Sequence, residues 1–153
     1  MIVVVDIDGT VTSPCDRLKY LNQSPKDWDS FYEKCGEDAP QDDIIKMLKI
    51  MYYNDEESVD FVFCTGRRES CRVDTEEWLR INMSFAWPSP LLMRENGDKR
   101  HDTIVKPSML SEYLFLNNKN DSDVSLIFED RNSMVKKWRE LGYRCLQVQD
   151  GDF

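Results

Sequence analysis

The chain has 153 residues, enough for one domain with a substantial core, and its hydrophobic content of 41% is ordinary for a globular protein. Its net charge of −9 argues against a long basic track for nucleic acid but leaves room for a local cationic pocket. No apolar run reaches the roughly 20 residues that cross a bilayer, so we expect no membrane segment. Five cysteines without CxxC spacing and a single histidine make a zinc site improbable and favour reduced thiols in the cytoplasm.

The first predicted element is a strand at the very start of the chain. Ile2–Val5 is a continuous β-branched run without alternation, which is typical of a strand buried on both faces of a parallel sheet. Asp6 and Asp8 follow it, and Gly9 allows a sharp turn. Ligands bind at the carboxyl ends of strands in open α/β sheets, so the two acids indicate a catalytic or cation-binding site. A plain Asp-Gly turn is the alternative, but it does not account for Asp6.

The segment from about residue 11 to 40 has no clean periodicity. It contains a predicted short helix at 28–34, and it is either a structured surface segment or a flap over the end of the first strand. Helices and strands alternate after it, with a polar loop at 94–102 and a helix whose first turn is marked by Pro107. The predicted helices are 41–53, 71–82, 107–116 and 133–141, and the further predicted strands are 59–64, 91–93, 124–128 and 144–148. This alternation predicts an α/β fold with a parallel sheet covered on both faces.

Further polar residues stand at comparable places in this pattern. Thr65 follows the second strand, Glu129 and Asp130 follow the fourth, and Lys106 lies at the start of a helix. Carboxylates gathered at one edge of a sheet would hold a hard cation such as Mg²⁺, and a hydroxyl and an ammonium would hold an anion beside it. Taken alone, each of these residues has an ordinary structural explanation, as part of a turn, as a solvated lysine or as a helix cap. Together they favour phosphoryl transfer with a nucleophilic carboxylate.

With these motifs in order, the sequence resembles the haloacid dehalogenase superfamily of phosphohydrolases. Asp6-Ile7-Asp8-Gly9-Thr10 is similar to its DxDGT motif, and Phe63-Cys64-Thr65-Gly66-Arg67, Lys106 and Glu129-Asp130 are similar to the other three. The resemblance implies a Rossmann-like three-layer α/β/α sandwich with a central parallel five-stranded sheet. It also implies a small flap or cap at about 11–40, inserted after the first strand. We interpret residues 1–153 as a single domain of this kind.

The resemblance also implies catalytic roles. Asp6 would attack phosphorus and form an aspartyl-phosphate, and Asp8 would act as general acid and base. Thr65 and Lys106 would bind the phosphoryl oxygens. The implied Mg²⁺ ligands are Asp6, the backbone carbonyl of Asp8, Asp130 and, through water, Glu129.

A narrower resemblance is to the 3′-phosphatase domain of bacteriophage polynucleotide kinases. It depends on Arg17, on the stretches 65–69, 97–106 and 147–153, and on Asp130-Arg131. Position 129 is Glu where Asp is common, which keeps the carboxylate. The resemblance implies substrate-binding roles for Arg17, Gly66, Arg67 and Asp102. The sequence has no GxxxxGK[ST] motif, so we expect no kinase domain within it.

The leading hypothesis is a Mg²⁺-dependent phosphomonoester hydrolase that removes 3′-phosphate from nucleic-acid ends, in a role in nucleic-acid repair. Its partner would be a phosphorylated nucleic-acid end or a nucleotide. A phosphatase of mononucleotides or other small phosphometabolites is the alternative, favoured by the acidic composition. An inactive domain that binds a partner protein is the alternative from a different class. We expect a cytoplasmic protein, in the host cytoplasm if a phage encodes it. The sequence does not decide between a monomer and a homodimer.

Overall fold

The computed structural model describes residues 1–54 and 58–151. Its centre is a five-stranded, fully parallel sheet in the order β5-β4-β1-β6-β7, which confirms the predicted α/β fold. The strands are β1 (Ile2–Val5), β4 (Asp60–Arg68), β5 (Leu91–Arg94), β6 (Val124–Arg131) and β7 (Cys145–Gly151). The β-branched run of β1 occupies the middle position, where a strand is covered on both faces.

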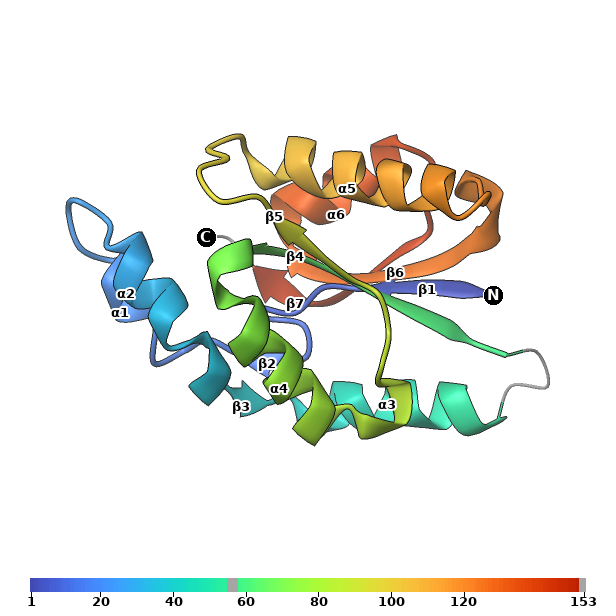
Figure 1. Cartoon of the computed structure of the whole chain (residues 1–153), viewed down its shortest axis with the longest axis horizontal. Helices are drawn as coiled ribbons and strands as arrows, with labels where there is room; N and C mark the ends of the chain where they lie inside the picture. Colours follow the sequence, from blue (N-terminus) through green and yellow to red (C-terminus); the bar gives the residue numbers. More distant parts are fainter. Residues whose placement is uncertain (55–57, 152–153) are drawn as a thin grey trace.

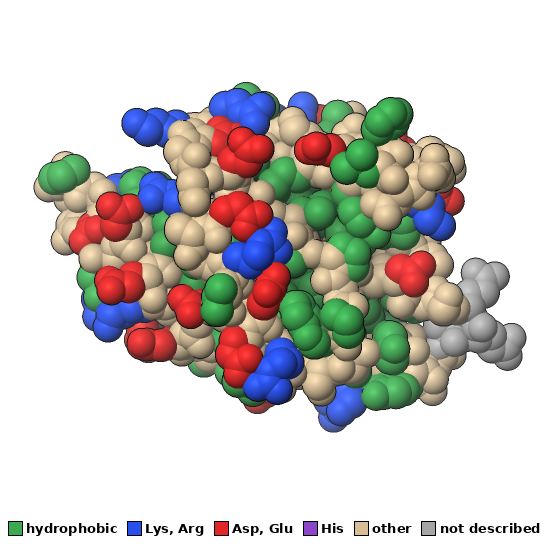
Figure 2. All heavy atoms as spheres, in the orientation of Figure 1, with side chains coloured by type: hydrophobic (Ala, Val, Ile, Leu, Met, Phe, Trp, Pro, Cys, Tyr) green, Lys and Arg blue, Asp and Glu red, His purple; other side chains and the backbone are tan. Residues whose placement is uncertain are grey.

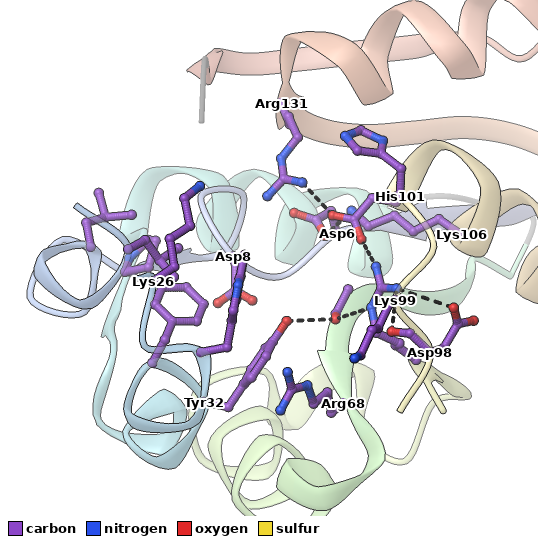
Figure 3. Close-up of a pocket in the computed structure, with 18 of the residues that line it drawn as sticks. Asp6, Asp8, Lys26, Tyr32, Arg68, Asp98, Lys99, His101, Lys106 and Arg131 are labelled. Atoms are coloured by element: carbon purple, nitrogen blue, oxygen red, sulfur yellow. Dashed lines mark hydrogen bonds and ion pairs between the residues drawn. The ribbon is translucent and has the colours of Figure 1, made fainter. Parts of the chain in front are cut away.

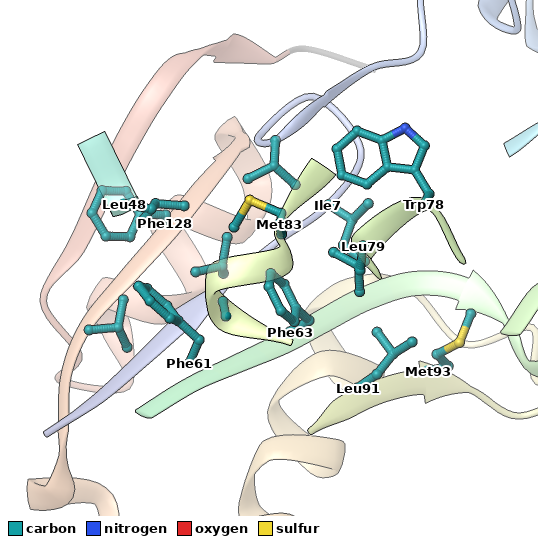
Figure 4. Close-up of a cluster of buried hydrophobic side chains, with 14 of the residues drawn as sticks. Ile7, Leu48, Phe61, Phe63, Trp78, Leu79, Met83, Leu91, Met93 and Phe128 are labelled. Atoms are coloured by element: carbon teal, nitrogen blue, oxygen red, sulfur yellow. The ribbon is translucent and has the colours of Figure 1, made fainter. Parts of the chain in front are cut away.

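Helices cover both faces of the sheet and complete three layers (Figure 1). The long helices in the described part of the chain are α3 (Asp42–Asn54), α4 (Arg72–Asn82), α5 (Asp102–Leu116) and α6 (Asn132–Glu140). Successive side chains of β1 point to opposite faces. Val3 and Val5 join the buried cluster with Leu48 of α3 and Leu79 of α4, part of which Figure 4 shows. Ile2 and Val4 join the cluster formed with α5 and α6. The described residues also contain four short 3-10 helices: η1 (Cys35–Glu37), η2 (Glu69–Cys71), η3 (Ser84–Ala86) and η4 (Asp121–Asp123).

The register of the three central strands decides where the site lies. Val5 of β1 pairs with Phe63 of β4 and with Phe128 of β6. The residues that follow these three positions therefore come out at the same edge of the sheet. This is the edge at which the sequence predicted the acidic and hydroxyl side chains to meet.

The segment between β1 and α3 forms an insert beyond that edge. Its base is an antiparallel pair of short strands, β2 (Thr12–Ser13) and β3 (Ala39–Pro40). Between them, α1 (Leu18–Leu21) and α2 (Trp28–Glu33) project past the ends of the parallel strands (Figure 1). We call residues 14–38 the flap. The helix at 28–34 was predicted, whereas α1 was not.

Several boundaries differ from the prediction, and β7 too runs past its predicted end, to Gly151. Helix α5 begins at Asp102, where His101 caps it by accepting a hydrogen bond from the Thr103 N–H, and Pro107 lies inside the helix. The prediction of a start at Pro107 was wrong because it rested on the preference of proline for first turns, whereas the His101 cap begins the helix five residues earlier and Pro107 removes one hydrogen bond from its interior. Lys106 therefore lies in the second turn. Strands β4 and β6 run past their predicted ends to Arg68 and Arg131, with irregular pairing there.

The structure also bears on membrane segments and on the state of the cysteines. Among residues 1–54 and 58–151, no helix combines the length and the apolar character needed to cross a membrane. All five cysteines are free thiols, four of them buried.

Candidate active site

Asp6 lies directly after β1 and is almost completely buried. Lys106 reaches it from α5, with its Nζ 2.6 Å from Asp6 Oδ1 and 2.8 Å from Glu129 Oε2. The Thr10 hydroxyl donates to the other Asp6 oxygen at 3.2 Å. Burial would lower the pKa of Lys106, but its attraction to Asp6 and Glu129 outweighs burial and holds the pKa well above the usual value. The lysine is therefore a fixed cation beside the Asp6 carboxylate.

Asp6, Glu129 and Asp130 form a cluster in which one oxygen from each lies within 4.8 Å of the others. Burial, reinforced by the neighbouring carboxylates, raises the pKa of Asp6 to about 7 and the pKa of Asp130 to about 8. Asp130 Oδ2 is buried and has no hydrogen-bond partner in the described part of the chain. A Cβ atom on Gly9, whose φ is +88°, would overlap this carboxylate. The donor set and the unpartnered oxygen fit a hard divalent cation such as Mg²⁺.

The carboxylate of Asp8 is not part of this cluster, because two arginines hold it. Arg17 Nη2 lies 2.6 Å and Arg67 Nη2 2.7 Å from Asp8 Oδ1. Both arginines also bind Asp38, through Arg17 Nε at 2.7 Å and Arg67 Nη2 at 2.9 Å. Burial would raise the pKa of Asp8, but Arg67 and Arg17 outweigh it and hold the pKa well below its usual range. Asp8 is therefore a carboxylate in this arrangement.

The sequence predicted that Arg17 and Arg67 contact substrate, and the structure places both behind Asp8. Their side chains are 2% and 0% exposed, and neither lines the cleft described below. Arg17 lies at the start of α1, donates to the Phe31 carbonyl at 2.8 Å and packs its guanidinium 4.2 Å from the centre of the Phe31 ring. It therefore ties both flap helices to Asp8.

Asp38 is the residue that the sequence analysis missed. It joins Arg17 to Arg67, and the Trp78 indole N–H anchors its backbone carbonyl at 2.8 Å. Its partners are 21 and 29 residues away in the sequence, and it stands in a segment rich in acidic residues. No local pattern distinguishes it from its neighbours, so only the folded structure identifies it.

The remaining predicted residues divide between the cleft and the layer behind it. Thr65 is fully buried and its hydroxyl accepts a hydrogen bond from the Arg67 backbone N–H at 3.1 Å. Gly66 and Asp102 line the cleft. The Gly66 carbonyl accepts hydrogen bonds from Tyr32 and Arg94, and a Cβ at this position would lie 2.8 Å from Asp102 Oδ1. Asp102 itself pairs with Arg94 and with Arg131, the latter at 2.5 Å.

A cleft of about 700 Å³ opens above Asp6 and Lys106. The flap forms one wall, with Lys26 and Tyr32, and the start of α5 with its preceding loop forms the other, with Lys99 and His101 (Figure 3). The basic residues that line it are Lys26, Arg68, Arg94, Lys99, Arg100, His101, Lys106 and Arg131. Six acidic residues also line the cleft: Asp6, Asp8, Asp98, Asp102, Glu129 and Asp130. Most of its basic side chains form ion pairs with carboxylates, among them Arg94, Arg100 and Lys106. The face shown in Figure 2 likewise mixes acidic and basic side chains, without a continuous basic track among the residues drawn in colour.

The fold and this site define a haloacid dehalogenase-like phosphatase domain. The haloacid dehalogenase-like family protein SP0104 from Streptococcus pneumoniae shares the fold, with a TM-score of 0.65 at 12% identity over 95% of this chain and 83% of that one. The family of polynucleotide kinase PNKP phosphatase domains matches residues 1–153. The chain belongs to this family.

Two solved chains show the same relationship. A chain in the structure of the Pnkp1/Rnl/Hen1 RNA repair complex is 27% identical, with a TM-score of 0.73 over 99% of this chain and 43% of that one. A chain in another structure of the Pnkp1/Rnl/Hen1 complex is 28% identical, again with a TM-score of 0.73, over 99% and 47%. The present chain thus spans less than half the length of these two relatives.

Proposed function

We propose that the protein is a Mg²⁺-dependent 3′-phosphatase of nucleic-acid ends that acts through an aspartyl-phosphate on Asp6. One observation carries the proposal. A buried carboxylate, Asp6, stands at the floor of a polar cleft between a fixed cation, Lys106, and two further carboxylates, Glu129 and Asp130. Membership of the PNKP phosphatase family supports this assignment.

Asp6 is suited to be the nucleophile because it is held from two sides, by Lys106 at 2.6 Å and by the Thr10 hydroxyl at 3.2 Å. The same ammonium can turn to a phosphoryl oxygen and stabilise charge that develops during transfer. Mg²⁺ at Asp6 and Asp130, supported by Glu129 and with the Asp8 carbonyl as the fourth proposed contact, would offset the repulsion between these carboxylates and a phosphate dianion.

Asp8 is the proposed general acid and base, and its environment constrains how it works. Arg17 and Arg67 keep it charged but make it a weak base, so it can accept a proton from the hydrolytic water only where these contacts loosen and its pKa rises. To protonate a leaving sugar oxygen, Asp8 must first gain a proton, and this requires weaker contacts to at least one arginine. The two arginines therefore act on the reaction through Asp8, and Asp38 sets how they are placed.

The cleft supports a nucleotide-sized substrate. Its volume of about 700 Å³ lies within the range of roughly 300–1,000 Å³ that small-molecule sites occupy. Gly66 and Asp102 are the predicted substrate-binding residues that line it, whereas Thr65, which precedes Gly66 in the chain, is fully buried and does not line it. We propose that Thr65 acts on the phosphoryl site from this buried position.

A phosphatase of mononucleotides or small phosphometabolites is the second candidate, favoured by the net charge of −9 and by the lack of a basic track on the face in Figure 2. Phosphate release with Mg²⁺ should be compared on a 3′-phosphorylated oligonucleotide, a 3′-mononucleotide and a sugar phosphate. The proposal predicts the highest kcat/KM for the oligonucleotide. A higher kcat/KM for either small substrate would favour the second candidate, and no release from any substrate would favour a non-catalytic, partner-binding domain.

A further inference from the structure

The wall of the cleft that the flap provides is aromatic. Trp28 and Tyr32 stack with their ring centres 6.0 Å apart and their planes 23° apart, and Phe31 meets the Trp28 ring edge-on at 6.0 Å. All three residues line the cleft. From this arrangement we infer that Trp28 stacks on the terminal nucleobase of a single-stranded nucleic acid whose 3′-phosphate lies at Asp6. The inference rests on the proposed function and identifies how that site would recognise more than the phosphate.

The exposure of Trp28 distinguishes it from the tryptophans of the core. Its side chain is 38% exposed, whereas Trp78 and Trp138 are 4% and 1% exposed. A partly exposed ring that lines a cleft is available to pack against the flat face of a ligand. A nucleobase is flat and apolar on its faces, and stacking on an aromatic side chain is the usual way in which single-stranded nucleic acid is bound without sequence preference.

Charges next to the ring match the rest of a nucleotide. The Lys26 ammonium lies 5.7 Å from the centre of the Trp28 ring, where it can pair with a backbone phosphate once a base covers the indole. Across the cleft, Lys99 lines the opposite wall and forms no ion pair with any described residue (Figure 3). The aromatic rings of the flap, with Lys26 beside them and Lys99 across the cleft, suit a ligand with a flat base and an anionic backbone.

A small sugar phosphate would leave the aromatic wall unused, because it carries no flat apolar face. A nucleotide uses both walls, and an oligonucleotide also offers a second phosphate to Lys26 or Lys99. We therefore expect the terminal base to improve binding whichever base it is, since every base presents a π-face.

The test compares two 3′-phosphorylated oligonucleotides that differ only in the last nucleoside, which is intact in one and abasic in the other. Trp28→Ala should lower kcat/KM on the intact substrate at least about fivefold more than on the abasic one, mainly through KM. Trp28→Phe should recover most of this loss because it keeps a stacking ring. Phe115→Ala removes a ring that is 79% exposed on α5 and does not line the cleft, so it serves as the matched control and should change neither rate.

A binding measurement separates this inference from the proposed function. With Ca²⁺ in place of Mg²⁺, which should support only poor turnover, the intact oligonucleotide should quench tryptophan emission of the parent protein, whereas the abasic one should not, and Trp28→Phe should remove the response. Equal effects of Trp28→Ala on both substrates, or equal quenching in the parent and in Trp28→Phe, would overturn the inference. Quenching that depends on Trp28 without any phosphate release would instead overturn the proposed function and leave the stacking site standing.

Discussion

Replacing Arg17 with lysine keeps a positive charge but removes the fork that joins Asp8 to Asp38. The guanidinium contacts Asp8 at 2.6 Å, Asp38 through two nitrogens and the Phe31 carbonyl at 2.8 Å, and its side chain is 2% exposed. A single ammonium cannot satisfy all these acceptors at once. Hydrogen bonds to charged groups contribute about 1.5–3 kcal/mol each, so we expect Arg17→Lys to lower the free energy of unfolding by about 2 kcal/mol.

The loss of these contacts should also slow the reaction, because Arg17 helps to fix the position and the pKa of Asp8. We expect kcat/KM on a 3′-phosphorylated oligonucleotide to fall at least about tenfold, which corresponds to about 1.4 kcal/mol. We also expect the acidic limb of the pH profile to move to higher pH, since losing part of a cationic neighbour raises the pKa of Asp8 toward its usual range. Urea unfolding and steady-state kinetics from about pH 3 to about pH 8 measure both effects.

Arg80→Lys provides the matched control. Arg80 is 58% exposed and pairs with Glu77 on the surface of α4, so its replacement should change stability by less than about 0.5 kcal/mol and leave the kinetics unaltered. The loss of unfolding free energy caused by Asp38→Asn should not add fully to the loss caused by Arg17→Lys, because both changes disturb the same ion pairs. An Arg17→Lys enzyme with parental stability, kcat/KM and pH profile would refute the reasoning.

Three further predictions concern the carboxylates. Asp6→Asn should abolish turnover while circular dichroism and urea unfolding show a folded protein; activity within a few-fold of the parent would exclude Asp6 as nucleophile. Chelator should abolish phosphate release, and Mg²⁺ should restore it. Ca²⁺ should restore it only poorly, because the looser coordination of Ca²⁺ relaxes the geometry of phosphoryl transfer. Full activity in chelator would contradict the proposed metal role of Asp130. The pKa values of Asp6 and Asp130, about 7 and about 8, lie above the unfolded value of about 3.9. The stability that their protonated forms contribute is therefore present below about pH 4 and lost as pH rises to about 8 without metal. Mg²⁺ needs the charged forms, so it should raise Tm more at pH 8.5 than at pH 6, and an equal rise at both would contradict the assignment.

The strands could be predicted because their signals are local. Ile2–Val5 and the four later strands were recognised from apolar runs, and parallel pairing then placed Asp6, Thr65 and Glu129 at one edge. The start of α5 was misplaced because Pro107 is a strong first-turn signal, while the His101 cap is a weak one. Helix α1 has four residues and no buried residue, so it has no periodicity to detect.

The site could be predicted as a set of residues but not as a geometry. The motifs identified Asp6, Lys106 and the acidic pair, and the structure brings these together. The sequence could not show whether the guanidinium of Arg17 points into the cleft or lies behind Asp8, because that depends on how the flap packs. Asp38 is defined only by partners far away in the sequence, so no motif could reveal it.

The most direct test of the central claim uses one oligonucleotide that carries a single phosphate at either its 3′ or its 5′ end. Phosphate release is measured with Mg²⁺, and the Asp6→Asn variant serves as the blank. The account predicts release from the 3′ end at a clearly higher kcat/KM than from the 5′ end, and none from the blank. Equal rates at the two ends, or faster release from the 5′ end, would contradict it.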